Sequence, residues 1–261
     1  MNRLQNLFKK KNTNLLSVFY TAGYPNLNDT VPIGVALQKA GADLIEIGIP
    51  FSDPVADGPT IQESNKVAID NGIHVKRILQ QVQELRQQVQ MPIILMGYLN
   101  PVLQYGMEQF CADASAAGAD GCIFPDMPWH DYEKQYKTLF QKSGLSHIFL
   151  IAPTTAAARI ERIDAATDSF IYAVSASSTT GTRGSFTPEQ LTYFQRLKEA
   201  QLKNPFLVGF GVANHETFRT ACRYGAGAIV GSAFIQLLKS KGGDEAAIAA
   251  FVAEMKGAAP E

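Results

Sequence analysis

The feature that most constrains the fold of this chain is a set of eight short apolar segments that recur along its 261 residues. They lie at residues 15–20, 44–49, 93–98, 121–124, 148–152, 170–175, 206–210 and 228–230. Apolar runs of this length are typical of strands that are buried on both faces, as in parallel sheets. Between them lie segments with helical spacing, of which the clearest places an apolar stripe at Ile78, Val82, Leu85 and Val89. The chain therefore predicts eight strands that alternate with helices.

The ends of the predicted helices carry residues that suit those positions. Thr187, Pro188 and Gln190 offer an N-cap hydroxyl, a proline at the first helical position and a side chain able to close a capping box, and Asn214 can cap the next helix. A glycine at a helix end takes the left-handed conformation without a steric penalty. Four glycines are expected to do so: Gly41, Gly118, Gly144 and Gly225.

Eight strand–helix units favour an α/β fold of the closed (β/α)8 TIM barrel type over a doubly wound sheet. A doubly wound sheet usually has fewer strands and a glycine-rich fingerprint after the first strand, which this sequence lacks. Because no linker marks a second domain, we expect residues 1–261 to form a single barrel domain. Residues 2–10 are expected to form an extra amphipathic helix at the bottom of the barrel, and residues 155–167 and 244–256 additional outer helices.

Charge and cysteine content exclude several classes of function. Lysine and arginine number 23 against 24 aspartates and glutamates, so nothing indicates binding to nucleic acid or to an anionic membrane. Three cysteines without CxxC spacing argue against a zinc knuckle and a disulfide framework. The start of the chain does not resemble a signal peptide and no segment is apolar enough to span a bilayer, so we expect a cytoplasmic location.

Glu46 lies inside the second apolar segment. In a strand it faces the same side as Leu44 and Gly48, whereas Ile45 and Ile47 face the other side. Because barrel strands are buried on both faces, burial is expected to raise the pKa of this carboxyl and to suit it to proton transfer. The alternative is an ion pair with a basic residue inside the barrel, although no predicted strand contains one.

Asp53 and Asp57 follow in a loop that three prolines stiffen. Loops at the carboxyl ends of barrel strands commonly carry active-site groups. Either aspartate can instead cap the helix that begins near Pro59, and the two readings stay open. Asp57 is near enough to Glu46 in sequence to share its pocket.

Glycines follow each of the last three predicted strands. Backbone N–H groups exposed by glycine, or by the start of a helix, bind phosphate, and barrels commonly bind phosphate after the seventh and eighth strands. Tight turns are the alternative reason for glycine at these positions. The residues concerned are Thr180 and Gly181, Gly209 to Gly211, and Gly231 and Ser232.

Two kinds of aldolase chemistry are disfavoured. A Schiff-base aldolase requires a lysine in the barrel mouth, but the candidate lysines fall on predicted helices or at their ends, at Lys39, Lys66, Lys76 and Lys198. A metal-dependent aldolase requires clustered ligands, but the four histidines are scattered along the chain. We therefore expect neither a metal ion nor a Schiff base.

Residues 46–62 resemble the signature of the tryptophan synthase alpha subunit family. The similarity extends over essentially the whole chain, including residues 21–25, 100–101, 126–128, 209–211 and 231–232. The resemblance implies a carbon–carbon lyase of L-tryptophan biosynthesis. Such an enzyme cleaves indole-3-glycerol phosphate by a retro-aldol reaction to indole and glyceraldehyde 3-phosphate, without a cofactor in this chain.

The resemblance also implies roles for individual residues. Glu46 is expected to be the catalytic acid and base, and Asp57 to hydrogen-bond the indole N–H. Thr180 is expected to hydrogen-bond Asp57 when a mobile loop closes. The phosphate is expected at Gly181, Gly211, Gly231 and Ser232, and the remainder of the substrate in a pocket lined by Phe19, Ile61, Tyr98, Tyr172 and Phe210.

The family works as an α2β2 complex with a beta subunit that contains pyridoxal phosphate and receives indole through a tunnel. The resemblance places four residues at that interface: Asp53, Pro54, Asn100 and Asp126. The sequence departs from the family pattern at Ala176 and Ser178, where an arginine and a glycine are usual, so closure of that loop is expected to differ. Two alternatives stay open: a regulatory subunit with weak turnover of its own, and another phosphosugar-processing barrel enzyme that uses Glu46 as a base.

Overall fold

The structure is a computed structural model that describes residues 2–175 and 184–257. The strands of this part of the chain are β1 (Leu15–Thr21), β2 (Leu44–Gly48), β3 (Ile93–Met96), β4 (Gly121–Ile123), β5 (Ser146–Ile148), β6 (Leu150–Ile151), β7 (Ile171–Val174), β8 (Phe206–Gly209) and β9 (Gly227–Val230). The helices before β5 are α1 (Arg3–Lys10), α2 (Thr30–Ala40), α3 (Pro59–Asp70), α4 (Val75–Arg86), α5 (Leu99–Tyr105), α6 (Met107–Ala117), α7 (Trp129–Asp131), the π-helical turn η1 (Tyr132–Tyr136) and α8 (Lys137–Ser143). Those after β6 are α9 (Ala157–Ala166), α10 (Pro188–Glu199), α11 (His215–Tyr224), α12 (Ser232–Lys241) and α13 (Glu245–Lys256).

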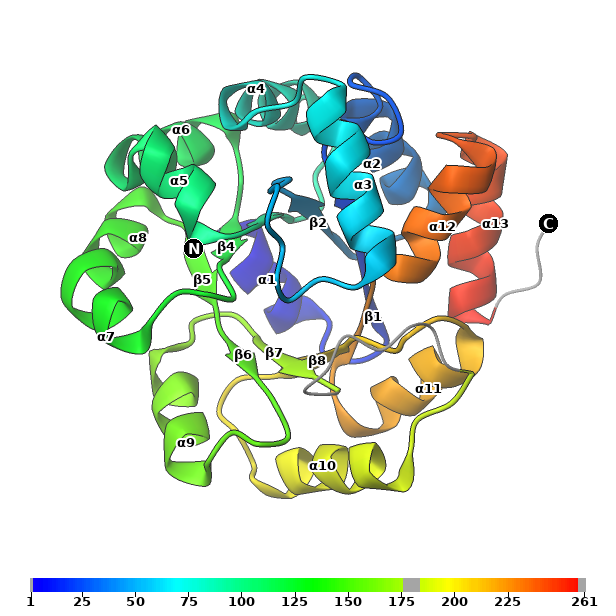
Figure 1. Cartoon of the computed structure of the whole chain (residues 1–261). Coiled ribbons are helices and arrows are strands. Elements are labelled where there is room, and N and C mark those ends of the chain that lie inside the picture. Colours follow the sequence, from blue (N-terminus) through cyan, green and yellow to red (C-terminus); the bar gives the residue numbers. More distant parts are fainter. Residues whose placement is uncertain (1, 176–183, 258–261) are drawn as a thin grey trace.

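The strands form one parallel sheet in the order β5-β4-β3-β2-β1-β9-β8-β7-β6. Its two ends, β5 and β6, are consecutive pieces of chain that only Phe149 separates, so the sheet closes on itself. Phe149 O accepts a hydrogen bond from Tyr172 N at 2.9 Å and so continues the pairing across this junction. The predicted fifth strand is thus one interrupted strand, and the (β/α)8 barrel is confirmed (Figure 1).

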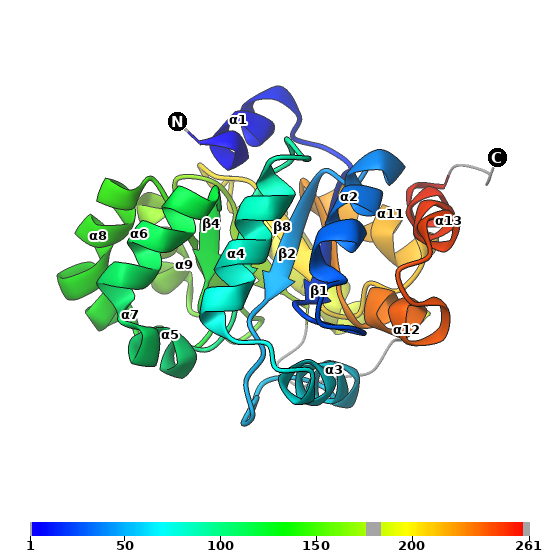
Figure 2. The same cartoon turned by 90° about the horizontal axis from the view of Figure 1, so that it is seen from above.

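Helices surround the barrel, and two of them mark its opposite ends. In Figure 2, α1 lies across one end, whereas β2 points toward α3 at the other. Asn2 and Gln5 form a capping box at the start of α1, and the fully buried Leu4 packs into the apolar interior of the barrel. The predicted helix at the barrel bottom is therefore confirmed, and the carboxyl ends of the strands open on the other side.

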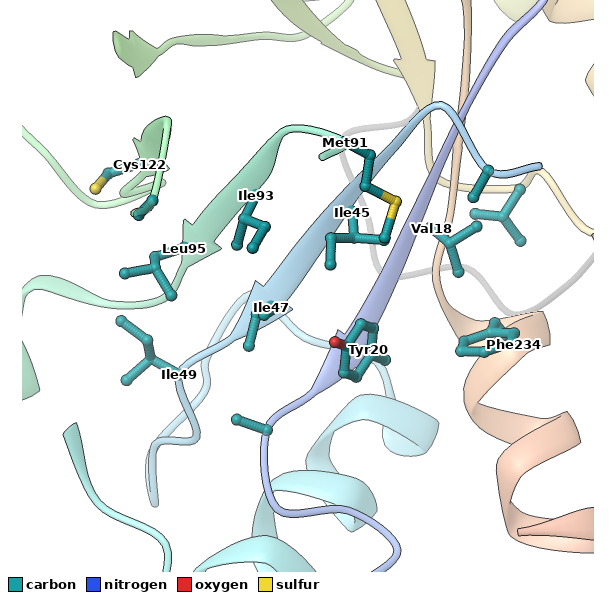
Figure 3. Packing of buried hydrophobic residues seen from close by; sticks show 14 of the residues in the cluster. Val18, Tyr20, Ile45, Ile47, Ile49, Met91, Ile93, Leu95, Cys122 and Phe234 are labelled. Atoms are coloured by element: carbon teal, nitrogen blue, oxygen red, sulfur yellow. The ribbon is translucent and has the colours of Figure 1, made fainter. Parts of the chain in front are cut away.

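Successive side chains of each strand point to opposite faces of the sheet and so form two separate apolar layers. The interior layer includes Leu44, Ile94, Ile148 and Leu207, and the outer layer lies between strands and helices. Figure 3 shows the outer layer around β2, where neighbouring side chains from three strands pack together: Val18, Tyr20, Ile45, Ile47, Ile49, Ile93 and Leu95. Because Ile45 and Ile47 face outward, Glu46 faces the interior, as its position in the strand predicts.

The predicted helix ends are confirmed, and one expected glycine conformation is not. Thr187 and Asn214 cap α10 and α11 through capping boxes. Gly41, Gly118 and Gly144 end their helices in the left-handed conformation, with φ of 91°, 92° and 68°. The left-handed prediction for Gly225 is wrong, because its backbone is extended and a Cβ there would lie 2.7 Å from Phe206 O. Close packing against β8, not helix termination, requires glycine at this position.

The interpretation of residues 155–167 as an additional outer helix is also corrected. This segment forms α9, which connects β6 to β7 and is the crossover that two neighbouring parallel strands require. The helix at the end of the chain, α13, is confirmed, and Asp244 caps it. No helix within residues 2–175 and 184–257 has the length and apolar character needed to cross a membrane.

Candidate active site

Glu46 is an acid in the interior of the barrel. Its side chain is fully buried, and Ser17 Oγ donates a hydrogen bond to Glu46 Oε1 at 2.8 Å. Within the described residues Glu46 Oε2 has no hydrogen-bond partner, and no ion pair includes Glu46. Burial raises the pKa of this carboxyl to about 8, against a smaller opposing effect of the Ser17 hydrogen bond. The ion-pair alternative therefore does not hold in this part of the chain.

Asp57 lies in the loop between β2 and α3 and is half-buried. Asn65 Nδ2 donates a weak hydrogen bond to Asp57 Oδ2 at 3.4 Å. Burial raises the pKa of Asp57 to about 6, although hydrogen bonds from Tyr98 and Asn65 favour the charged form. The N-cap of α3 is Gly58, and no side chain caps this helix. Neither Asp57 nor Asp53 has the capping role that the sequence left open.

Two cavities that share five lining residues open at the carboxyl ends of the strands. The shared residues are Phe19, Asp57, Ile61, Met96 and Phe210. The first cavity is also lined by Tyr172, Gly211, Gly231 and Ser232, and the second by Tyr98. The structure thus brings together eight of the ten residues expected to bind substrate. The other two, Thr180 and Gly181, lie outside the described residues.

Two glycines make room for aromatic rings in this site. A Cβ at Gly48 would lie 2.6 Å from Phe19 Cζ, and a Cβ at Gly209 would overlap the ring of Tyr172. The strands pair Thr21 with Gly48 and Val174 with Gly209, so each ring lies beside the glycine of the adjacent strand. Glycine at these positions therefore permits the close approach that places Phe19 and Tyr172 over the barrel interior.

Tyr172 lies within the electrostatic reach of both carboxyl groups. Burial, and to a lesser extent the charges of Glu46 and Asp57, hold the pKa of its phenol well above its ordinary value. Asp57 lines both cavities, whereas Glu46 lines neither of them. The site therefore contains one carboxyl at the cavity wall and a second, buried carboxyl outside both cavities.

The beginning of α12 forms one wall of the first cavity. Gly231 is the N-cap of this ten-residue helix and, as a glycine, offers no side chain to accept a hydrogen bond from the N–H groups of its first turn. Gly231 and Ser232 line the cavity beside Gly211, which has a φ of 73°. Free N–H groups and the helix dipole together favour an anion at such a position.

The four residues expected at a partner interface follow the carboxyl ends of three strands, at this same end of the barrel. Asp53 and Pro54 follow β2, Asn100 lies in the first turn of α5 after β3, and Asp126 follows β4. Three of them are exposed, and Pro54 is half-buried. The carboxylate of Asp126 accepts hydrogen bonds of 3.0 Å from Leu99 N, which ties the β4 loop to the start of α5.

Several residues of the site were not recognised in the sequence. Met96 and Asn65 line the cavities, and Ser17 contacts Glu46. A signal existed for Ser17 and Met96, because Ser17 faces the same side of its strand as Phe19, and Met96 the same side as Ile94. Among the described residues, no group of three His, Cys, Asp or Glu side chains is arranged to hold a metal ion.

Comparisons with known proteins identify the family. The sequence model of the tryptophan synthase alpha chain family matches residues 4–259. The tryptophan synthase alpha chain of Flavobacterium psychrophilum is 49% identical over 255 residues, which cover 98% of this chain and 100% of that protein. The alpha chain of Parabacteroides distasonis is 51% identical over 241 residues, or 92% of this chain and 94% of that one. The crystal structure of the alpha subunit from Legionella pneumophila is 35% identical, covers 98% of both chains and superimposes with a TM-score of 0.87. The chain therefore belongs to the tryptophan synthase alpha chain family.

Proposed function

We propose that Glu46 and Asp57 carry out the lyase reaction of this family, the cleavage of indole-3-glycerol phosphate to indole and glyceraldehyde 3-phosphate. The observation that carries the assignment is a buried carboxyl, without an ion-pair partner among the described residues, next to a cavity that has aromatic walls and a helix N-terminus at one side. The aromatic walls suit an indole ring, and the helix N-terminus suits a phosphate.

Glu46 has the protonation state that the first step requires. A carboxyl with a pKa of about 8 is mostly protonated at pH 7, so it can donate its proton to C3 of the indole. The resulting carboxylate then removes the proton from the hydroxyl on the carbon attached to C3, while the carbon–carbon bond breaks and the aldehyde forms. One proton enters at C3 and one leaves the hydroxyl, so Glu46 ends each cycle protonated.

Asp57 complements this acid because its pKa differs. With a pKa of about 6 it is mostly ionised at pH 7, and a carboxylate beside the indole N–H stabilises the positive charge that protonation of C3 creates. Tyr98 and Asn65 orient this carboxylate by hydrogen bonding. Two carboxyl groups in different surroundings thus supply an acid and an anion from the same site.

The other substrate contacts follow from the cavity lining. We assign the indole and glycerol portions to Phe19, Ile61, Tyr98, Tyr172 and Phe210, and the phosphate to Gly181, Gly211, Gly231 and Ser232. Thr180 is assigned a hydrogen bond to Asp57 in a closed loop, and closure excludes water from the intermediate. The substitutions Ala176 and Ser178 lie in the same loop, outside the described residues, and their effect on closure stays a prediction.

The family implies a beta subunit as partner, and we propose an α2β2 complex formed through Asp53, Pro54, Asn100 and Asp126. Pyridoxal phosphate is assigned to the beta subunit, since the proposed chemistry of this chain uses its carboxyl groups alone. As a step of amino-acid biosynthesis, the reaction is assigned to the cytoplasm. Turnover is expected to be slow in the isolated chain and faster in the complex, where the partner orders the loops of the site.

Product analysis tests this function. The isolated chain, and the chain with its beta subunit but without serine, are incubated with indole-3-glycerol phosphate, and indole and glyceraldehyde 3-phosphate are quantified by chromatography. Equal amounts of both products are expected, with a higher rate in the complex. Conversion to an isomeric phosphosugar without free indole would instead identify an isomerase, and turnover absent from both samples would indicate a purely regulatory subunit.

A further inference from the structure

Ser17 is the residue that fixes the orientation of the Glu46 carboxyl. Both side chains are fully buried, and the Ser17 Oγ to Glu46 Oε1 distance of 2.8 Å is that of an ordinary, well-formed hydroxyl–carboxyl hydrogen bond. The second oxygen, Glu46 Oε2, has no partner within the described residues. A single hydrogen bond therefore determines where this flexible acid rests.

The strand register shows that this hydrogen bond draws the carboxyl toward the amino ends of the strands. β1 and β2 are parallel, with Ser17 beside Leu44 and Phe19 beside Glu46. Ser17 thus lies two residues nearer the amino end of β1 than Phe19, the register partner of Glu46. Ile229, the register partner of Ser17 on β9, lines the first cavity, whereas neither Ser17 nor Glu46 lines either cavity. The carboxyl therefore rests turned toward Ser17 and outside both cavities.

In the part of the chain that the structure describes, the groups around Glu46 provide no positive charge that would compete with Ser17. The residues paired with Glu46 on the two adjacent strands are apolar: Phe19 on β1 and Ile94 on β3. On β7, Tyr172 is a titratable group whose phenol pKa the charges of Glu46 and Asp57 both raise. No Lys, Arg or His of the described residues pairs with Glu46.

We propose that Ser17 is a positioning residue for Glu46, whose hydroxyl holds the carboxyl outside the cavities until substrate draws it toward them. The proposal deepens the proposed function, since it rests on Glu46 as the proton donor. Each turnover then breaks this hydrogen bond, and loss of the hydroxyl makes the reactive position of the carboxyl easier to reach. Ser17 also favours the ionised form of Glu46, because its hydroxyl donates to the carboxylate.

Ser17→Ala tests the proposal in the free protein by an NMR titration of the Glu46 side-chain carbonyl carbon, assigned from its absence in Glu46→Gln. The titration midpoint is expected to move to higher pH by about one pH unit, as loss of a hydrogen bond to a charged group predicts. Ser146→Ala is the matched control, because Ser146 is also a buried serine of the barrel interior but contacts Asn2. A midpoint that is unchanged in Ser17→Ala, or equally moved in Ser146→Ala, overturns the proposal.

Kinetics test the positioning role in the reaction. In Ser17→Ala, kcat at pH 7 is expected to rise by about fivefold, the equivalent of one ordinary hydrogen bond, with KM unchanged. The alkaline limb of the pH–rate profile is expected to move with the NMR midpoint, and Ser17→Thr, which keeps a hydroxyl, to restore both. A lower or unchanged kcat in Ser17→Ala overturns the positioning role. If the unmodified chain released no indole, the proposed function would fail, whereas the titration would still decide whether Ser17 holds Glu46.

Discussion

Two carboxyl groups at the same end of the barrel differ in pKa because they are buried to different extents. Glu46 is fully buried and has a pKa of about 8, whereas the half-buried Asp57 has a pKa of about 6. Burial of Glu46 destabilises its charged form and therefore costs folding stability as the pH rises from 4.5 through 8. Such a cost is common where a group is placed for chemistry and not for stability.

His147 is a second buried titratable residue, and it lies outside the proposed site. It is on β5 among aromatic rings, the nearest being that of Phe149 at a centroid distance of 4.6 Å, and neither ring nitrogen has a partner within the described residues. Burial lowers the pKa of His147 to about 3. Because the unfolded chain binds a proton near pH 6.5 and the folded chain does not, stability is expected to be lost as the pH falls below 6.5.

The contribution of His147 between pH 7.5 and pH 5 is expected to be a loss of about 2 kcal/mol in the free energy of unfolding, which opposes the gain that Glu46 gives over the same range. His147→Phe should remove this contribution, so that stability at pH 5 relative to pH 7.5 is about 2 kcal/mol higher in the variant than in the unmodified chain. Denaturant unfolding of both proteins at the two pH values measures it. His130→Gln is the control, since His130 is exposed on α7. The same change in stability between the two pH values in His147→Phe and in the unmodified chain would show that His147 does not contribute.

At the scale of the secondary-structure elements, local sequence predicted the strands and caps but not the features that depend on closure of the barrel. Apolar runs located all eight strands, and Thr187 and Asn214 marked two helix starts. The interruption of the fifth strand at Phe149 lies where pairing with β4 gives way to pairing with β7, so it depends on both neighbouring strands. The conformation of Gly225 depends on its close approach to β8, and the residues near Gly225 in the sequence do not indicate this contact.

The candidate site was predicted to a similar extent. Glu46 and Asp57 stood out as carboxyl groups within or beside an apolar strand, and the glycine clusters marked the rim of the cavity. Ser17 was missed although it faces the same side of its strand as Phe19, because its hydrogen bond to Glu46 joins two strands and neither strand alone indicates it. Burial patterns can be inferred from one strand, but contacts across strands require the whole sheet.

The helix α1 permits a prediction about stability that is separate from function. Leu4 is fully buried at the amino end of the barrel, opposite the cavities. Leu4→Ala is expected to lower the free energy of unfolding by about 3 kcal/mol and to leave kcat and KM unchanged below the melting temperature. Denaturant unfolding and steady-state kinetics measure these quantities, with Asn6→Ala, at an exposed position of α1, as the control. A loss of activity in folded Leu4→Ala would show that the two ends of the barrel are coupled.

At the scale of the whole molecule, parallel strands concentrate chemistry and partner recognition at one end. The loops after β2, β3 and β4 carry the residues assigned to the beta-subunit interface, and the first of these loops also carries Asp57. Val55 in the same loop is 88% exposed, which is unusual for an apolar side chain and suits a surface that a partner covers. An interface at this position lies directly beside the site.

Asp53→Lys tests this arrangement. The exposed Asp53 takes no part in any ion pair of the described residues, so the substitution is expected to leave the melting temperature of the isolated chain unchanged. Affinity for the beta subunit, measured by calorimetry, is expected to fall at least about tenfold at low salt and less at high salt. Glu161→Lys, the same charge reversal on the exposed face of α9, should have no effect on affinity. Unchanged binding of Asp53→Lys would place the interface elsewhere.

The most direct test of the account is the rate of indole release from indole-3-glycerol phosphate by Glu46→Gln, measured in a single turnover with excess enzyme. Glutamine keeps the size of the side chain and the hydrogen bond with Ser17 but cannot shuttle a proton. We predict that the rate falls by at least about a hundredfold, whereas Glu108→Gln, at an exposed position of α6, retains the rate of the unmodified chain. Indole release at an undiminished rate by Glu46→Gln would contradict the assignment of the buried acid as the proton donor.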